Sequence, residues 1–316
     1  MKTRTRESYD ATLRLHILPV AVGSGTFGDL PMVEIRRPLV KALLAQQRSA
    51  GYSRDSVRIT LAVLSAMCEA AVEDDLLVAN PAHRLRKKLR LGTSKDARAE
   101  DIRALTQEEL DGALATAREC SPALFPLYLT LARTGLRIGE ALGLDDTDPE
   151  VFDFDGRRVR VLRQLGRRGV IGTPKSGYGR DVDLSQELVA VLKAQIADKK
   201  KAKLAGQWTD FPRWTFCTSR GTPYTARNVL RDWYRVQDRA KLLDAEGAPR
   251  FDLHSFRHTF ASLHILAAAT LPWLQEQLGH SDVRLTRSTY GKWFKLRDLA
   301  AADRQDARSR LVVVQP

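Results

Sequence analysis

The sequence predicts a mainly α-helical protein of two domains, with a small antiparallel β-sheet inside the second domain. Apolar residues recur at helical spacing through the first hundred residues and again after residue 225. Short β-rich pieces separated by glycine-containing turns lie between residues 158 and 184. A polar stretch without apolar periodicity interrupts the helices near residue 100. The predicted divisions are a helical domain at 1–90, a linker at 91–104, a larger domain at 105–295 and a C-terminal tail at 296–316.

The charge balance points to a polyanionic partner. The chain has 51 Lys and Arg against 38 Asp and Glu, a net charge of +13. Residues 1–100 hold 17 basic and 11 acidic side chains (+6), and the remainder holds 34 and 27 (+7). The surplus is therefore spread over both halves of the chain, which favours a polyanionic partner contacted by both: nucleic acid or, less often, an acidic membrane surface.

Several classes of protein are excluded or disfavoured by composition. The sequence has no apolar stretch of about 18 residues and no secretory signal core, so we expect a cytoplasmic chain that is neither exported nor membrane-spanning, with no membrane partner. Its three cysteines show neither a disulfide framework nor a metal-ligand spacing. We therefore expect reduced structural cysteines and no metal site built on them.

The first domain is predicted to contain helices at 5–18, 36–50 and 53–74, with Gly51 ending the second helix and Ser53 capping the third. A basic run follows Asn80-Pro81. Its members are candidate contacts to DNA phosphates, and the alternative is a solvated charged face. The candidates are Arg84, Arg86, Lys87, Lys88 and Arg90. A second basic cluster lies at 199–203.

The second domain begins with the capping box at 106–109, whose Thr and Glu start a helix. The helix at 123–133 is apolar nearly all round and should be buried. Strands are predicted at 158–165, 170–173 and 180–184. Further helices are predicted at 186–197, 225–241, 253–268, 272–278 and 282–294.

Four short motifs carry candidate chemistry. In R-I-G-E at 137–140, Arg137 and Glu140 share one helix face, which taken alone indicates a structural ion pair. In H-S-F-R-H-T-F at 254–260, an apolar stripe should turn His254 and Arg257 together toward solvent, as a phosphate site or as a capping histidine beside a surface arginine.

The other two motifs are weaker when taken singly. T-P-K-S-G at 173–177 sets Lys175 at a hairpin turn, where most lysines are simply solvated. L-G-H-S-D at 278–282 presents His280, and Tyr290 stands ten residues further on. Tyr290 could equally be an ordinary half-buried aromatic residue.

Taken together and in this order, the motifs closely resemble those of the tyrosine recombinases of the phage-integrase family. The resemblance covers roughly residues 5–295. It implies a helical core-binding domain followed by an α+β catalytic domain, and a site-specific recombinase that integrates or excises a mobile element or prophage. It also implies double-stranded DNA as the partner, no cofactor and a nucleoid-associated location. The chain would be a homotetramer on DNA and a monomer or weak oligomer when free, with accessory bending or directionality factors.

The resemblance implies a role for each matching residue. Arg137 and Arg257 would clamp the scissile phosphate, while His254 and His280 would hydrogen-bond its oxygens or handle protons. Two permanent guanidinium groups suit an anionic transition state that forms without a metal.

The remaining roles concern attack and departure. Tyr290 would attack and form a 3′-phosphotyrosyl link, Lys175 would protonate the departing 5′ oxygen, and Glu140 would orient its neighbours. A phenol with a pKa of about 10 needs a nearby base and a positive field to attack at neutral pH.

Two alternatives stay open at this level: a type IB topoisomerase-like enzyme that relaxes DNA, and a non-catalytic DNA-binding protein on the same scaffold. The second would be expected to lack a member of the catalytic set, and every member has a counterpart in this sequence. We further expect no N-terminal arm-binding domain before residue 5 and a C-terminal tail at 296–316 that docks on a neighbouring protomer.

Overall fold

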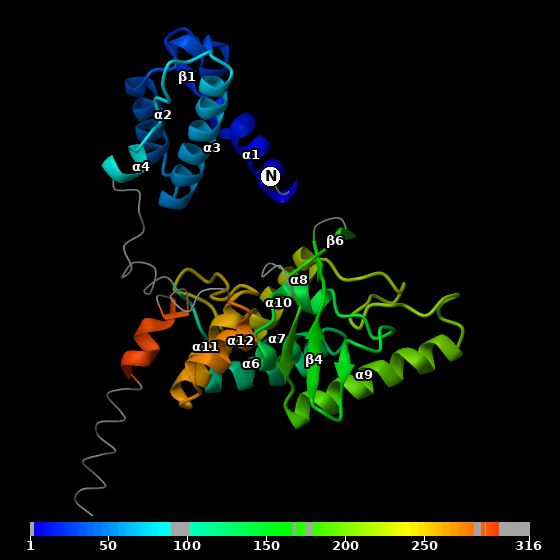
Figure 1. Cartoon of the computed structure of the whole chain (residues 1–316). Coiled ribbons are helices and arrows are strands. Elements are labelled where there is room, and N and C mark those ends of the chain that lie inside the picture. Colours follow the sequence, from blue (N-terminus) through cyan, green and yellow to red (C-terminus); the bar gives the residue numbers. More distant parts are fainter. Residues whose placement is uncertain are drawn as a thin grey trace, which may run out of the picture. The chain divides into compact units, whose positions relative to one another are not determined.

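The computed structural model describes residues 3–89, 102–166, 169–174, 179–280, 286–287 and 289–296. The chain forms two compact units, Met1–Ser94 and Lys95–Pro316. Figure 1 draws the first in blue and cyan and the second in green through orange. Each unit has its own hydrophobic core, and each is described by itself. Most of the predicted linker at 91–104 lies outside the described residues.

Unit 1 is a small helical domain with one two-stranded ladder (Figure 1). Its helices are α1 (Thr3–Thr12), α2 (Arg37–Ser49), α3 (Arg54–Glu73) and α4 (Leu85–Lys88). Strand β1 (Ala21–Val22) pairs antiparallel with β2 (Gly25–Thr26). Short helical turns are η1 (Leu13–Ile17), η2 (Phe27–Asp29) and η3 (Met32–Glu34). The helix predicted at 5–18 corresponds to α1 continuing into η1.

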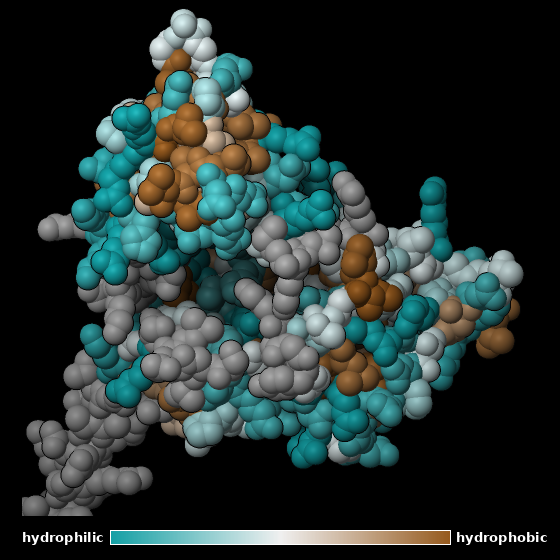
Figure 2. All heavy atoms as spheres, turned by 45° about the horizontal axis from the view of Figure 1, so that its top comes forward, coloured by the Kyte–Doolittle hydropathy of each residue, from teal (hydrophilic) through white to brown (hydrophobic). Residues whose placement is uncertain are grey.

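The core of unit 1 lies between α2 and α3, where Leu43 and Leu44 pack with Leu64 and Cys68. The Ser53 side chain caps α3 by accepting a hydrogen bond from the Ser56 backbone at 3.1 Å, as the sequence predicted. Apolar side chains also gather on the surface of this unit, as Figure 2 shows. The exposed large apolar residues of unit 1 are Leu15, Leu18, Val33, Tyr52, Ile59, Leu76 and Val78.

Unit 2 is mainly helical. Its helices are α6 (Gln107–Cys120), α7 (Phe125–Thr134), α8 (Ile138–Leu142), α9 (Gln186–Leu204), α10 (Ala226–Arg239), α11 (Ser255–Leu266) and α12 (Leu271–Leu278). Residues 286–287 and 289–296 are also helical. Helix α9 continues past the predicted end at 197, because the lysines and alanines that follow are good helix formers.

Two small antiparallel sheets accompany these helices, in agreement with the predicted fold class. One has the order β3-β4-β7 and the other pairs β5 with β6. The strands are β3 (Phe152–Asp153), β4 (Arg158–Val161), β5 (Gln164–Leu165), β6 (Ile171–Gly172) and β7 (Arg180–Asp183). The single strand predicted at 158–165 is therefore wrong in detail, since the chain leaves the first sheet after Val161.

Helix α7 is the centre of the unit 2 core, as its nearly continuous apolar sequence predicted. It contacts α6, α9 and α11. The Tyr128 ring of α7 stacks on Phe256 of α11, with centroids 6.0 Å apart, and Trp233 of α10 completes the cluster. The capping box at 106–109 forms as predicted, with reciprocal hydrogen bonds of 3.2 and 2.9 Å. The packing of Phe256 against Tyr128 and Trp233 fixes the position of α11.

Gly135 ends α7 in the left-handed conformation, with φ of +62°. A Cβ atom there would lie 2.6 Å from Cδ1 of Phe260. Gly247 offers a matched comparison, because its φ is +78° and nothing lies within 4 Å of an added Cβ.

We expect Gly135→Ala to lose about 1 kcal/mol from backbone strain and about 1 to 3 kcal/mol more from the displaced Phe260 ring. Gly247→Ala should show the strain alone. Urea unfolding of both variants measures the difference, and equal losses would contradict the close contact with Phe260.

Candidate active site

A buried carboxylate at the start of α8 organises several of the predicted residues. Glu140 has no exposed surface. Its Oε2 accepts hydrogen bonds from the Arg137 backbone at 3.0 Å and from Nη2 of Arg180 at 2.9 Å. Its Oε1 accepts from Nη1 of the same two arginines, at 3.0 and 3.2 Å. Burial raises the pKa of this carboxyl, but the bonds and charges of Arg180 and Arg137 outweigh burial and hold the pKa at about 2.

Arg180 is a member of this cluster that the sequence analysis did not identify. It begins β7 with 6% of its side chain exposed, and its Nε donates to the Gln277 carbonyl at 3.1 Å. Its position in the strand held a signal, because Arg180 lies two residues before the buried Val182 and so faces the same, buried side of the strand. A charged residue on the buried face of a strand calls for a partner.

Arg257 lies deep in the site. It is 1% exposed, and its Nη1 and Nη2 donate to the carbonyls of Gly135 and Leu278 at 2.9 and 2.5 Å. Burial, with the charge of Arg137, lowers the pKa of Arg257 to about 9, so it remains cationic at neutral pH. The expectation that Arg257 and His254 both face solvent is therefore wrong for Arg257. His254 is exposed.

Tyr290 is buried beside these cations, with 1% of its surface exposed. Burial raises the pKa of its phenol to about 12, while the charges of Arg257 and Arg137 act in the opposite direction. Its hydroxyl oxygen lies 3.1 Å from Nδ1 of His258. The structure thus brings Tyr290 and both predicted arginines together.

His258 lies within the motif at 254–260, and no role was predicted for it. It follows His254 by one helical turn, and the two rings meet edge to face with centroids 4.7 Å apart. Burial, helped by His254 and nearby cations, lowers the pKa of His258 to about 4. Its spacing of four residues from His254 was the available signal, since i and i+4 share a helix face.

His280 follows the end of α12. Its Nδ1 lies 2.7 Å from the Thr286 hydroxyl. Burial and the charges of Arg257, Arg137 and Arg180 lower the pKa of His280 to about 3, which keeps its imidazole neutral at neutral pH. A neutral imidazole has one donor and one acceptor nitrogen.

Other predicted residues lie elsewhere. Lys175 and Arg90 fall outside the described residues. The other basic candidates of unit 1 have exposed side chains on or next to α4. These are Arg84, Arg86, Lys87 and Lys88. In unit 2, Lys199 is no free basic residue, because it is 3% exposed and its Nζ binds the Asp146 carboxylate at 2.6 Å.

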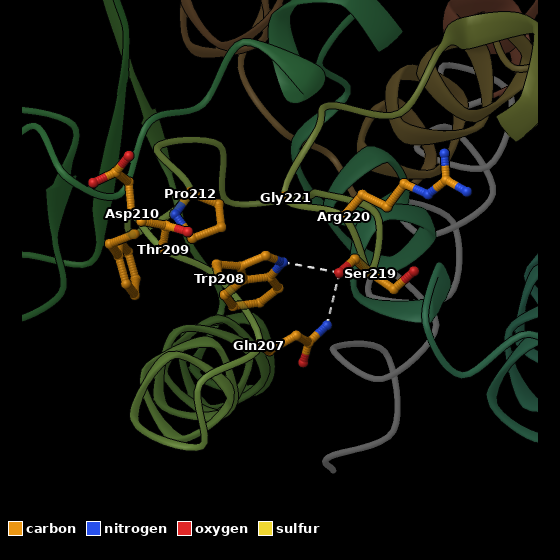
Figure 3. Close-up of a pocket in the computed structure, with 9 residues that line it drawn as sticks. Gln207, Trp208, Thr209, Asp210, Pro212, Ser219, Arg220 and Gly221 are labelled. Carbon is orange, nitrogen blue, oxygen red and sulfur yellow. Dashed lines mark hydrogen bonds between the residues drawn. The ribbon is translucent and has the colours of Figure 1, made fainter.

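The described residues contain no group of three or more His, Cys, Asp or Glu side chains arranged to hold a metal ion. Within the same residues, no helix is long and apolar enough to cross a membrane. A pocket lined by residues 207–212 and 219–221 shares no residue with the Tyr290 cluster. Figure 3 shows Gln207 and Trp208 pointing to the Ser219 carbonyl, to which both donate at 2.8 Å.

The arrangement has a definite chemical capacity. The guanidinium group of Arg137, 23% exposed, can bind an anion, and Arg257 adds a second fixed positive charge. The Tyr290 phenol is a potential nucleophile next to a neutral imidazole. Together these groups suit transfer of an anionic group, such as a phosphoryl group, to the phenol oxygen.

The comparison with protein families decides the relationship. The model of the phage integrase family matches residues 103–295. The chain belongs to the phage integrase family. The resemblance inferred from the motifs is thereby confirmed.

Several curated proteins align over most of the chain. A tyrosine recombinase XerC-like protein of Caldanaerobacter subterraneus is 27% identical over 258 residues, covering 76% of this chain and 63% of the relative. The integrase of Mycobacterium phage D29 is 29% identical over 287 residues, covering 89% of this chain and 68% of the relative. The transposase from transposon Tn916 of Enterococcus faecalis is 27% identical, and the chain spans 59% of its length.

Solved structures share the fold. The Tn1549 transposon integrase in complex with transposon right end DNA superposes with a TM-score of 0.75 at 22% identity, covering 97% of this chain and 95% of that one. A lambda integrase dimer bound to a core site gives a TM-score of 0.63 at 18% identity, covering 90% of each chain. The two-domain fold of the family is therefore confirmed.

We expect Glu140→Gln to destabilise this integrase-family fold by about 3 kcal/mol, because it leaves Arg180 buried without a counter-charge. Glu187→Gln is the matched control. Glu187 pairs with Arg133 at 3.3 Å but is 47% exposed, so its loss should cost less than about 1 kcal/mol. Denaturant unfolding measures both, and a Glu140→Gln loss no larger than the control would show that the buried ion pairs are dispensable.

Proposed function

We propose that this chain is a site-specific DNA recombinase that cleaves and rejoins DNA strands through a 3′-phosphotyrosyl intermediate on Tyr290. The observation that carries the proposal is the burial of the Tyr290 phenol within the field of Arg257 and Arg137. Membership of the phage integrase family supports the same reaction. The relatives' names, integrase and transposase from a transposon, support a role on a mobile element or prophage.

The named residues divide the work of the reaction. Arg137 and Arg257 would hold the non-bridging oxygens of the scissile phosphate, whose negative charge grows in the transition state. His254 and His280 would donate hydrogen bonds to the same group or handle protons. Glu140 would keep Arg137 in place through its hydrogen bonds.

The proposed reaction conserves bond energy and needs no cofactor. The Tyr290 oxygen forms a bond to phosphorus while the bond from phosphorus to the 5′ oxygen breaks. Lys175 would protonate the departing 5′ oxygen. In the reverse step a 5′ hydroxyl attacks the phosphorus of the phosphotyrosyl link. The bond from phosphorus to the Tyr290 oxygen then breaks, which rejoins the strand and frees the phenol.

The proposed partner is double-stranded DNA. The exposed basic residues near α4 would contact phosphates from unit 1, and the active site would contact the scissile phosphate from unit 2. Similarity in fold to integrases solved in complex with DNA supports this partner. We further propose a homotetramer on DNA, assisted by bending or directionality factors, acting at the nucleoid.

The proposal is tested on a nicked suicide substrate that carries the recognition site. Wild-type protein should accumulate a covalent adduct, whereas Tyr290→Phe should bind the same DNA and form none, because the nucleophilic oxygen is gone. Tyr234→Phe, which removes an exposed hydroxyl from α10, is the matched control and should react like the wild type. Adduct formation by Tyr290→Phe at the wild-type rate would overturn the proposal.

A further inference from the structure

We propose that His258 is a further catalytic residue, the base that takes the proton of the Tyr290 phenol as its oxygen attacks the DNA phosphate. The inference rests on the proposed function and adds a residue to it. It assigns the proton-accepting atom as Nδ1 of His258, which lies 3.1 Å from the phenol oxygen.

The first support is the position of the two side chains. Tyr290 is 1% exposed, so bulk water has little access to its hydroxyl. Among the described residues, His258 is the hydrogen-bond partner of that oxygen. A base must lie within hydrogen-bond reach of the proton that it abstracts, and 3.1 Å meets that requirement.

The second support concerns the tautomer of His258. A phenol whose pKa is about 12 keeps its proton at neutral pH, and a buried hydroxyl needs an acceptor for it. An imidazole whose pKa is about 4 is neutral there and has one acceptor nitrogen. The hydrogen bond to Tyr290 therefore makes Nδ1 the acceptor and leaves the ring proton on Nε2.

The charged groups around His258 explain why the transfer waits for substrate. The imidazolium form of His258 is disfavoured by three neighbours: His254, the N-cap of α11; Arg257 of α11; and Lys292, from the segment that carries Tyr290. Asp252 favours the imidazolium. A bound phosphodiester would bring negative charge next to Arg257 and partly offset these cations. The same phosphate bonds to the phenolate oxygen as the proton leaves it. That oxygen, which is more basic than the imidazole, therefore cannot take the proton back.

The step balances in protons and bonds. The phenol proton moves from the Tyr290 oxygen to Nδ1 of His258 as the bond from oxygen to phosphorus forms. The 5′ oxygen leaves with its bonding electrons and takes a proton from the general acid, the role proposed for Lys175. During rejoining, the 5′ hydroxyl gives its proton back to Lys175 as its oxygen bonds to phosphorus, and His258 returns its proton to the departing phenol oxygen.

The test is single-turnover cleavage of the nicked suicide substrate by His258→Asn across a range of pH. An asparagine can still accept a hydrogen bond near the Nδ1 position but cannot take a proton. We expect the variant to cleave at least about 10²-fold more slowly than the wild type at neutral pH. Its rate should rise up to about tenfold per pH unit toward high pH, where hydroxide replaces the missing base, while the wild-type rate stays nearly flat.

A second measurement separates proton transfer from positioning. A fluorinated tyrosine with a more acidic phenol, placed at position 290, should restore much of the rate lost by His258→Asn, because a more acidic phenol depends less on a base. A rate loss that neither high pH nor the fluorinated residue repairs would assign His258 a positioning role and overturn the proposal.

His264→Asn is the matched control. His264 is another half-buried histidine of α11, and its Nδ1 lies 2.9 Å from the Phe260 carbonyl. We expect this variant to keep the wild-type rate and pH profile. Wild-type cleavage by His258→Asn would also overturn the inference, whereas absence of any adduct with wild-type protein would instead overturn the proposed function. Thermal unfolding and DNA binding confirm that each variant is folded.

Discussion

The buried carboxylate of Glu140 is the interaction on which the rest of the site depends. It joins Arg137 at the start of α8 to Arg180 of β7, two segments that are distant in sequence. Arg180 also binds the Gln277 carbonyl near the end of α12, and Arg257 binds carbonyls at the ends of α7 and α12. Helix C-termini carry partial negative charge, so they can hold buried guanidinium groups in place. The cations are therefore fixed before any phosphate arrives.

These fixed cations set the chemistry of the phenol that lies among them. Burial makes the Tyr290 phenolate costly, and Arg257 and Arg137 reduce that cost. Burial, with smaller contributions from nearby cations, lowers the pKa of His258 to about 4 and that of His280 to about 3, so both imidazoles are neutral at neutral pH. A site of this kind is arranged for charge that develops during the reaction, which is the condition for electrostatic catalysis.

Local patterns predicted much of the fold, and distant contacts account for what they missed. The capping box beginning at Thr106 and the antiparallel strands follow from neighbouring residues, and both formed. The buried position of Arg257 did not follow, because α11 is covered on more than the one face that its apolar stripe marked. Arg180 and His258 acquire their partners 40 and 32 residues away in sequence. The catalytic roles of the motif residues remain predictions.

The central claim is that Tyr290 carries the DNA strand in the covalent intermediate. Its most direct measurement is mass spectrometry of the wild-type adduct, trapped on a suicide substrate and then digested with protease and nuclease. We expect a nucleotide attached through phosphate to the Tyr290 side chain, on the peptide that contains Gly291 and Lys292. A nucleotide attached to another tyrosine, or to a serine, would contradict it.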